Sequence, residues 1–403
     1  MRIIKGGITA ARGFLASGIH CGIKYKKRDL ALIYSVIPSS ACGLFTQNRV
    51  KAAPIKVTQS HLRENNRAQA IVVNSANANC CTGSQGIRDA RRMCESVAGR
   101  LCIKPDDVLV ASTGIIGQRL PMKKIKNKTA LLVERLSSLA SLEAAEAIMT
   151  TDTLPKQISV EVKIGRAKVK VGGIAKGAGM ISPHLATMLA FITTDAAIDK
   201  RRLKTALEDA ADNSFNLITV EGDTSTNDMV LVLANGLAAN KVMTTEDFKV
   251  FRKALNFVCL SLAKMIIKDA EGASKFVEIH VEEARDIVQA KKVAFRVANS
   301  PLVKTALFGE NPNWGRIAAV VGAADKAVRE NGLNIYLGAE KALSRGIKVL
   351  GKGVALKADQ QKLCRLFKRA RIGIRITLGL GKFASHVFTC DLSDKYVEIN
   401  AKY

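Results

Sequence analysis

The 403-residue sequence predicts a mixed α/β protein, of the α+β kind, with two lobes and extensive mixed sheet packed by helices. Strand-like runs alternate with helix-like segments along the whole chain. The length exceeds that of one average domain. No fixed-period repeat and no Pro/Ser-rich linker divides the chain, and eight prolines argue against long disordered linkers. These patterns leave the sheet topology open.

In the first half, the expected strands are rich in β-branched or aliphatic residues and end at Ser, Asn, Gly or Pro. They are residues 30–37, 70–74 and 107–112, followed by a hairpin over 158–171 with Gly165-Arg166 at its centre. Residues 85–101 predict an amphipathic helix with arginines on its polar side. Its apolar face holds Ile87, Ala90, Met93, Cys94 and Val97.

In the second half, apolar runs predict strands at 185–194, 229–233 and 276–281. Helical periodicity covers residues 200–213 and 246–268, and residues 142–148 are also helix-like. Short apolar runs near the end predict strands at 372–378, 387–390 and 396–399.

The charge is unusual, because 62 Lys and Arg face 35 Asp and Glu, a formal net charge of +27. Such a balance suggests nucleic acid or an acidic membrane as a partner. However, the excess is spread over both halves, and no aromatic residues interleave with the basic runs 24–28 and 123–128 to stack on bases. A generally basic surface is therefore the preferred interpretation, and binding to nucleic acid is not expected.

Cysteine spacing and hydropathy indicate the compartment. The nine cysteines form no C-x-x-C pair and no zinc spacing, which favours buried free thiols in a reducing compartment and no metal site. No secretory leader is visible, and no run approaches the ~20 apolar residues of a membrane span. We expect a cytoplasmic protein without a membrane partner.

Two glycine-rich loops could carry chemistry. Four glycines surround Lys176 within residues 172–179, where the backbone can approach a ligand and the lysine can hold an anion. The loop lacks the Walker frame. The second loop begins Ser112-Thr113-Gly114 after a strand, and its backbone N–H groups could stabilise an oxyanion, although a plain glycine turn is equally consistent.

Three polar segments allow ordinary structural interpretations. Residues 149–153 are a hydroxyl cluster that ends at Thr153 and could be a helix cap or turn. Residues 222–228 lack the full EF-hand pattern, so a polar turn is favoured over calcium binding. Residues 268–273 include the acid pair Asp269 and Glu271. The sequence shows no G-x-S-x-G motif and no Ser/His/Asp frame. Judged without its neighbours, Thr187 is interpreted as an ordinary β-branched strand residue.

Taken in order, these segments resemble the ornithine acetyltransferase family, the glutamate N-acetyltransferases of arginine biosynthesis. The resemblance covers almost the whole chain, and its specificity comes from many motifs in the same order. They are Gly18-Ile-His-Cys-Gly22, Phe45-Thr-Gln-Asn-Arg-Val-Lys-Ala-Ala-Pro54, Val73-Asn-Ser-Ala-Asn-Ala-Asn79, Cys81-Thr-Gly83, Ser112-Thr-Gly-Ile-Ile-Gly117, Ala147-Ile-Met-Thr-Thr-Asp-Thr153, residues 172–195, Glu221-Gly-Asp-Thr-Ser-Thr-Asn-Asp228, Asp269-Ala-Glu-Gly-Ala273, Asn299-Ser-Pro-Leu-Val-Lys304, Phe308-Gly-Glu-Asn-Pro-Asn-Trp-Gly-Arg316 and Tyr396-Val-Glu-Ile-Asn-Ala401.

The resemblance implies the fold of that family and a precursor that cleaves itself between Ala186 and Thr187. An α chain (1–186) and a β chain (187–403) would stay associated as an α2β2 heterotetramer. The new Thr187 α-amine, with a reference pKa of ~7.7–8.0, would serve as base beside its own hydroxyl. Thr187 would take acetyl from N2-acetylornithine and pass it to glutamate without a cofactor, and acetyl-CoA is a possible second donor.

The resemblance also implies site residues. Thr113 and Gly114 match the family's oxyanion hole. The substrate-binding positions match Thr153, Lys176, Thr187, Glu271 and Asn400, with Lys176 expected at a carboxylate and Glu271 at the ornithine side chain.

Three departures from the family pattern stand out. The family usually continues past Asn400-Ala-Lys-Tyr403 with a substrate-contacting hydroxyl residue, and Lys402 replaces an aspartate. Ala76 replaces a glycine, which we expect to be mild. Residues 377–386 are more basic than usual. Two alternatives stay open: a related self-processing aminopeptidase or amidase, and an inactive basic homologue that binds nucleic acid.

Overall fold

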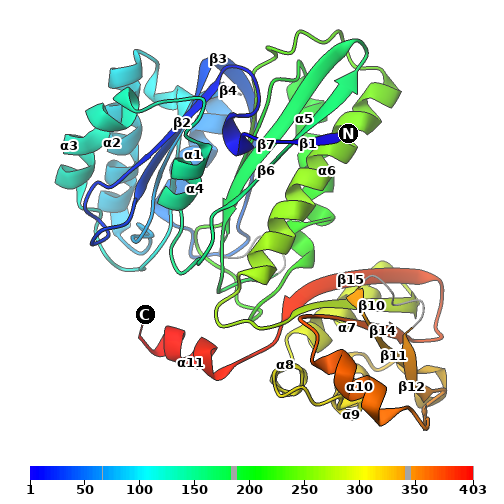
Figure 1. Ribbon diagram of the computed structural model, residues 1–403. Helices are drawn as coiled ribbons and strands as arrows, with labels where there is room; N and C mark the ends of the chain where they lie inside the picture. Colours follow the sequence, from blue (N-terminus) through cyan, green and yellow to red (C-terminus); the bar gives the residue numbers. More distant parts are fainter. Residues whose placement is uncertain (66, 183–187, 341–345, 403) are drawn as a thin grey trace. The chain divides into compact units, whose positions relative to one another are not determined.

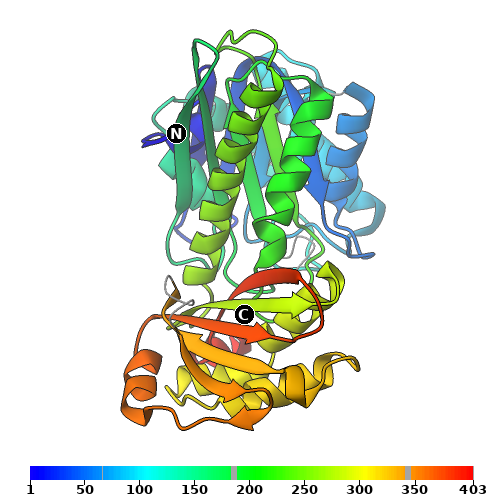
Figure 2. The same cartoon turned by 90° about the vertical axis from the view of Figure 1, so that its right-hand side faces the viewer.

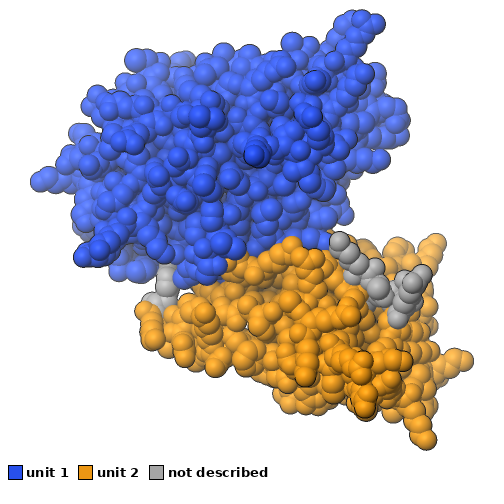
Figure 3. Space-filling view, viewed as in Figure 1, with its two compact units in different colours: residues 1–216, 223–266 blue, residues 217–222, 267–403 orange. Residues whose placement is uncertain are grey.

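The computed structural model describes residues 1–65, 67–182, 188–340 and 346–402. The chain divides into two compact units (Figures 1 and 3): unit 1 comprises residues 1–216 and 223–266, and unit 2 comprises residues 217–222 and 267–403. Each unit contains a mixed sheet packed by helices. The expected α/β class and the expected two lobes are therefore confirmed.

Unit 1 contains the longer part of the chain. Its strands are β1 (Arg2–Ile4), β2 (Phe14–Ile19), β3 (Leu30–Phe45), β4 (Arg67–Asn74), β5 (Val108–Ser112), β6 (Lys156–Ile164), β7 (Ala167–Lys176), β8 (Leu189–Thr194) and β9 (Met229–Ala234). Its helices are α1 (Ala53–Asn65), α2 (Gly83–Leu101), α3 (Met122–Glu134), α4 (Ser141–Ala147), α5 (Lys200–Asp212) and α6 (Thr245–Lys268), whose last turn enters unit 2. Short 3-10 turns are Gly7–Thr9, Pro105–Asp107 and Phe215–Leu217.

The sheet of unit 1 has the strand order β1-β6-β7-β8-β9-β3-β4-β5, and β2 pairs with β3. The β4–β5 and β8–β9 pairs are parallel, and the other pairs are antiparallel. The expected hairpin is β6–β7, which turns at Gly165 with a φ of +56°. Strand β8 confirms residues 189–194 of the expected strand, while residues 185–187 lie outside the described part of the chain.

Side chains on the two faces of this sheet enter different cores, as the alternation of a strand requires. In β4, Ile71 and Val73 join one core, while Ala70 and Val72 join the core beneath α2 and α3. Met93 of α2 fills that second core, as the amphipathic pattern predicted. Helices α5 and α6 run side by side over the sheet (Figure 2).

Unit 2 is built on a six-stranded sheet with the order β13-β12-β11-β14-β10-β15. Its strands are β10 (Phe276–Ala284), β11 (Asn334–Gly338), β12 (Ile347–Gly351), β13 (Val354–Ala355), β14 (Arg371–Thr377) and β15 (Phe383–Cys390). The β10–β14 pair is parallel. Helices α7 (Ile287–Ala298), α8 (Pro301–Phe308), α9 (Trp314–Ala324) and α10 (Gln360–Phe367) pack on the sheet around one core, and α11 (Asp394–Ala401) follows. A 3-10 turn spans Glu330–Gly332.

The expected strand at residues 396–399 is wrong, because these residues lie within helix α11. Ser393 caps this helix, since its hydroxyl accepts the Tyr396 N–H. Asp394 places a carboxylate in the first turn, where the helix dipole favours negative charge. Four residues are too few to separate a strand from a helix by periodicity, so the capping residues were the better signal.

The prediction of buried free thiols is confirmed for six of the nine cysteines. The other three, Cys81, Cys102 and Cys364, are free but exposed. Burial raises the pKa of Cys21 to about 12 and that of Cys42 to about 11, so these thiols stay protonated at neutral pH. Within the described ranges, no helix combines the length and the apolar composition needed to cross a bilayer.

Candidate active site

A buried charge cluster lies at the carboxyl end of β7. Lys176 is 2% exposed, and its Nζ donates a hydrogen bond to Thr150 Oγ1 at 2.8 Å. The same Nζ lies 3.8 Å from Asp152 Oδ2. Lys156, the first residue of β6, donates to Asp152 Oδ1 at 2.7 Å. Because β6 and β7 are paired strands, the turn before β6 and the end of β7 meet at this point.

Asp152 is ionised by its surroundings. Burial raises the pKa of its carboxyl, but the Lys176 and Lys156 ammonium groups and the Gly177 N–H outweigh burial and hold the pKa well below its usual range. The Gly177 N–H donates to Asp152 Oδ1 at 2.7 Å. The carboxylate of Asp152 therefore lies 2.7 Å from one ammonium group and 3.8 Å from another.

Lys24 is a further cation at this cluster that the sequence did not single out. Its Nζ donates to Met149 O at 2.6 Å and to Arg28 O at 2.9 Å. Burial lowers the pKa of Lys24 to about 8; Asp29 opposes this shift, and the charge of Lys176 adds to it. In the sequence Lys24 is one of several basic residues in the run 24–28. Nothing in that run indicates that Lys24 is partly buried near Lys176 while Lys26 and Lys27 are exposed.

The loop after β5 holds Thr113 and Gly114. The Thr113 N–H donates to Asn74 O at 3.1 Å, so the fold already uses this donor. Gly114 has a φ of +134°, and a Cβ there would lie 2.2 Å from the backbone carbon of Ala76. Only glycine fits that position. The groups of this loop that could meet an oxyanion are therefore the Thr113 hydroxyl and the Gly114 N–H, rather than the Thr113 N–H.

Ala76 itself adopts a φ of +72°. This left-handed conformation favours glycine, and a non-glycine residue pays roughly 1–2 kcal/mol there. The replacement of the family's glycine, expected to be mild, thus falls at a position where the backbone conformation gives glycine an advantage.

The segment 225–228, expected to be a polar turn, is buried and connects two loops. The Asn227 Nδ2 donates to Ser112 O at 2.9 Å and to Ala78 O at 2.6 Å. The carboxyl of Asp228 accepts the Met188 N–H at 3.0 Å. These contacts join residues 40 to 149 positions apart, so local spacing in the sequence does not reveal them.

Glu271 and Asn400 meet in unit 2. The Asn400 Nδ2 donates to Glu271 Oε2 at 2.8 Å and to Tyr396 O at 3.0 Å. The Ser393 hydroxyl donates to Gly272 O at 2.7 Å, which fixes α11 against the Glu271 loop. The structure thus brings together two of the predicted substrate-binding residues that are separated by 129 positions.

The other predicted residues are placed as follows. Thr113, Gly114, Lys176 and the exposed Thr153 belong to unit 1, whereas Glu271 and Asn400 belong to unit 2. Ala186 and Thr187 lie outside the described residues. Among the residues that the structure describes, no group of three or more His, Cys, Asp or Glu side chains is arranged to hold a metal ion.

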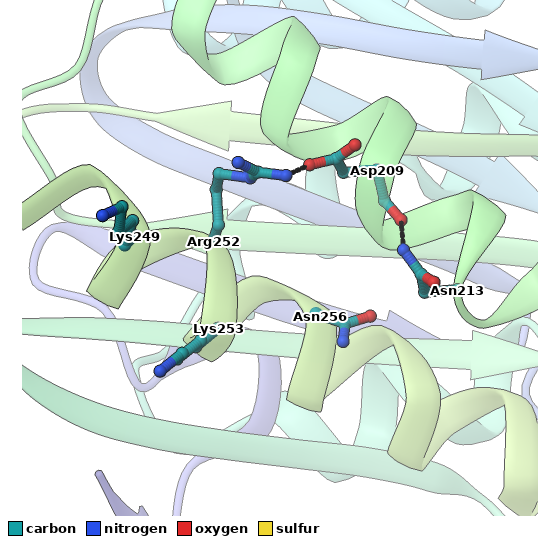
Figure 4. A pocket seen from close by; sticks show the side chains of 6 residues that line it. All are labelled: Asp209, Asn213, Lys249, Arg252, Lys253 and Asn256. Carbon is teal, nitrogen blue, oxygen red and sulfur yellow. Dashed lines mark hydrogen bonds and ion pairs between the residues drawn. The ribbon is translucent and has the colours of Figure 1, made fainter. Parts of the chain in front are cut away.

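A separate pocket lies between α5 and α6 of unit 1 (Figure 4) and contains none of these residues. Arg252 of α6 forms an ion pair with Asp209 of α5, and the Asn213 Nδ2 donates to the Asp209 carbonyl at 2.8 Å. The pocket is completed by Lys249, Lys253 and Asn256. Three of its described lining residues are basic, and none of the described ones is aromatic.

The chain matches proteins of one family over nearly its whole length. The ArgJ family model matches residues 15–403. The arginine biosynthesis bifunctional protein ArgJ of Bacillus licheniformis is 44% identical over 401 residues, covering 99% of this chain and 96% of the relative. That of Listeria monocytogenes serovar 1/2a is 44% identical over 405 residues and is covered completely, as is this chain.

Among solved structures, an ornithine acetyltransferase from Mycobacterium tuberculosis, crystallised with ornithine, is 40% identical with a TM-score of 0.42. It covers 45% of this chain, and 97% of that structure's own chain is matched. Given the match of the family model and of full-length relatives, the chain belongs to the ArgJ family of arginine-biosynthesis proteins.

Proposed function

We propose that this protein transfers an acetyl group from N2-acetylornithine to L-glutamate, giving ornithine and N-acetylglutamate. Membership of the ArgJ family supports the general role. The observation that supports an amino-acid substrate is the buried ammonium group of Lys176. It lies 2.8 Å from the Thr150 hydroxyl and 3.8 Å from Asp152, in a glycine-rich segment whose backbone can approach a ligand. An amino-acid carboxylate would suit this ammonium group, because a hydrogen bond between an ammonium and a carboxylate is among the stronger polar contacts in proteins.

The reaction begins with self-cleavage. The Thr187 hydroxyl attacks the Ala186 carbonyl carbon, so that a C–O bond forms and the Ala186–Thr187 C–N bond breaks, with the hydroxyl proton moving to the released nitrogen. Water then opens the ester, leaving a carboxylate on Ala186 and a free hydroxyl and α-amine on Thr187. This amine has a reference pKa of ~7.7–8.0, which suits a general base near neutral pH.

Acetyl transfer uses the same residue twice, in a ping-pong cycle. The Thr187 hydroxyl attacks the acetyl carbonyl of acetylornithine, the amide C–N bond breaks, and ornithine leaves with the transferred proton. The glutamate amine then attacks the acetyl ester and restores the hydroxyl. In both steps the Thr113 hydroxyl and the Gly114 N–H would stabilise the oxyanion, each such donor being worth about 10²–10³ in rate.

Glu271 is proposed to contact the ornithine side chain. Glu271 offers a carboxylate to its terminal ammonium, and the Asn400 amide holds that carboxylate at 2.8 Å. A Glu271→Gln protein keeps the shape and removes the charge, so its KM for acetylornithine should rise while its KM for glutamate changes less. An unchanged KM for acetylornithine would refute this assignment.

The names of the relatives include "bifunctional", and acetyl-CoA is proposed as a second donor to glutamate. The α and β chains are proposed to remain together as an α2β2 heterotetramer. Pairing of β7 with β8 favours association, because these neighbouring strands lie on either side of the cleavage point in the chain. Native mass spectrometry measures the assembly, and an assay with each donor measures the donor range.

The reaction scheme is tested on purified wild type and on the Thr187→Ala variant. Denaturing electrophoresis and intact mass measure cleavage, and a transfer assay measures activity. The scheme predicts fragments that begin at Met1 and Thr187 in the wild type, and one full-length chain without transfer activity in the variant. An uncleaved but active wild type would overturn self-cleavage. A cleaved protein that hydrolyses amides without transferring acetyl would favour the amidase alternative.

A further inference from the structure

Residues 225–228 lie where two parts of the proposed machinery meet in unit 1. Asn227 is 6% exposed, and its amide holds the carbonyl of Ser112, the residue before Thr113. Asp228 is fully buried, and its Oδ1 accepts the N–H of Met188, the residue bonded to Thr187. Adjacent residues on one segment thus contact the oxyanion loop and the peptide group that follows the nucleophile.

The segment is itself fixed from both sides. The Thr226 carbonyl accepts the Ala52 N–H at 3.0 Å, and the Asp228 carbonyl accepts the Thr46 N–H at 3.0 Å. The Thr226 hydroxyl donates to Asn227 Oδ1 at 2.6 Å, which sets the amide so that Nδ2 faces the carbonyl groups. Side chains held in this way have one orientation, as precise positioning of reacting groups requires.

We infer that Asn227 and Asp228 are positioning residues that hold the Met188 N–H, next to the proposed nucleophile, and the loop of Thr113 and Gly114 on one segment, an inference that rests on the proposed function. Neither residue is assigned a role in the chemistry itself. Oxyanion donors act at 2.7–3.1 Å from the developing charge, and a displacement of about 1 Å costs on the order of 100-fold in rate. Loss of either contact should therefore slow both self-cleavage and acetyl transfer.

The protonation of Asp228 indicates which substitution should be tolerated. Burial raises the pKa of its carboxyl well above the usual range, and the Met188 N–H opposes this shift without reversing it. Burial thus disfavours the charged form of this carboxyl. Its second oxygen, Oδ2, has no hydrogen-bond partner within the described part of the chain. An asparagine presents the same carbonyl oxygen to Met188, whereas alanine leaves that N–H without its acceptor.

Asp195 provides a matched control at the other end of β8, about 20 Å away at 3.3 Å per residue. It is also a fully buried aspartate that accepts backbone N–H groups, from Lys170 at 2.7 Å and from Arg12 at 3.2 Å. Asp195→Ala therefore removes a comparable structural contact, far from the oxyanion loop. Its folded fraction should cleave and transfer at rates within about threefold of wild type.

The experiment compares Asp228→Ala, Asp228→Asn, Asn227→Asp and Asp195→Ala with the wild type. Self-cleavage is followed by intact mass against time, and kcat and KM are measured on the cleaved protein. Asp228→Ala should lose about 100-fold in cleavage rate and in kcat with little change in KM, and Asp228→Asn should restore both rates to within about threefold. Asn227→Asp places an acceptor against two carbonyl oxygens and should lose at least as much as Asp228→Ala.

A readout independent of activity is amide hydrogen exchange in peptides that contain Met188, measured on uncleaved Thr187→Ala chains with and without Asp228→Ala. Faster exchange at Met188 in the double variant is the expected result. If the wild type neither cleaves nor transfers, the proposed function is overturned and the inference falls with it. If the wild type does both and Asp228→Ala behaves like Asp195→Ala, the inference alone is overturned.

Discussion

Replacement of Lys176 by methionine is the substitution whose effect the structure defines most closely. Methionine keeps much of the length of the side chain and removes the charge. The lost interactions include the 2.8 Å hydrogen bond to Thr150 Oγ1 and the 3.8 Å approach to Asp152. Asp152 would keep Lys156 at 2.7 Å and the Gly177 N–H at 2.7 Å, so the buried carboxylate stays compensated and the chain should fold.

Two magnitudes follow from these distances. Unit charges 3.8 Å apart interact by about 4 kcal/mol at an effective dielectric constant of about 20, and desolvation offsets much of this value, so we expect a stability loss of about 1–3 kcal/mol. A substrate carboxylate would lose a charged hydrogen bond worth about 1.5–3 kcal/mol. That loss corresponds to a decrease of about 10- to 150-fold in kcat/KM for acetylornithine.

The assay measures initial rates against acetylornithine concentration, with thermal unfolding measured in parallel. Lys156→Met is the matched comparison, because it removes the closer ion pair of the same aspartate. Breaking that buried pair should cost about 3–5 kcal/mol of stability with a smaller effect on KM. A Lys176→Met protein that is folded and keeps its kcat/KM would refute the role of Lys176 at the substrate carboxylate.

Three further predictions follow from single contacts. Gly114→Ala forces a Cβ to within 2.2 Å of Ala76 and should reduce cleavage and transfer by at least about 100-fold, which intact mass and rate assays measure; a fully active variant would contradict the loop geometry. The pKa of Asp152 is lowered in the folded state, so its contribution to stability is present above ~pH 3.9 and is lost as the pH falls through the folded value; in Asp152→Asn, acid titration should show a weaker dependence of unfolding free energy on pH below about 4, and an unchanged dependence would contradict the depressed pKa. Ser393→Ala removes the cap that accepts the Tyr396 N–H and should lower stability by about 1 kcal/mol and raise the KM for acetylornithine, whereas an unchanged thermal midpoint would argue against the cap.

Local patterns predicted much of the sheet and helix content correctly. The predicted helix 85–101 is α2 (Gly83–Leu101), because its apolar residues recur at helical spacing and fill one core. The hairpin 158–171 is β6–β7, because alternation and a central glycine specify both strands and turn. The strand predicted at residues 396–399 is wrong, because four residues show too little periodicity to separate a strand from a helix and Ser393 was not recognised as a helix cap.

The site residues were proposed partly from local patterns, since the glycine-rich loops at Lys176 and at Thr113–Gly114 stand out in the sequence, and partly from the family resemblance. That resemblance proposed Lys176 and the Thr113–Gly114 loop, but it did not indicate that the Thr113 N–H is already bound by Asn74. Lys24 stood out only as part of a basic run, and Asn227 and Asp228 only as part of a polar segment, because their contacts join residues far apart in the sequence. Such contacts depend on how strands pair, and the sheet topology could not be derived from local patterns.

The most direct test of the central claim is the intact mass of the fragment that begins at Thr187, measured after mixing with acetylornithine in the absence of glutamate. The account predicts that this fragment gains the mass of one acetyl group, that fragmentation places the group on the Thr187 hydroxyl, and that glutamate removes it. A fragment that stays unmodified during turnover, or that carries acetyl on another residue, would contradict Thr187 as the acetyl carrier.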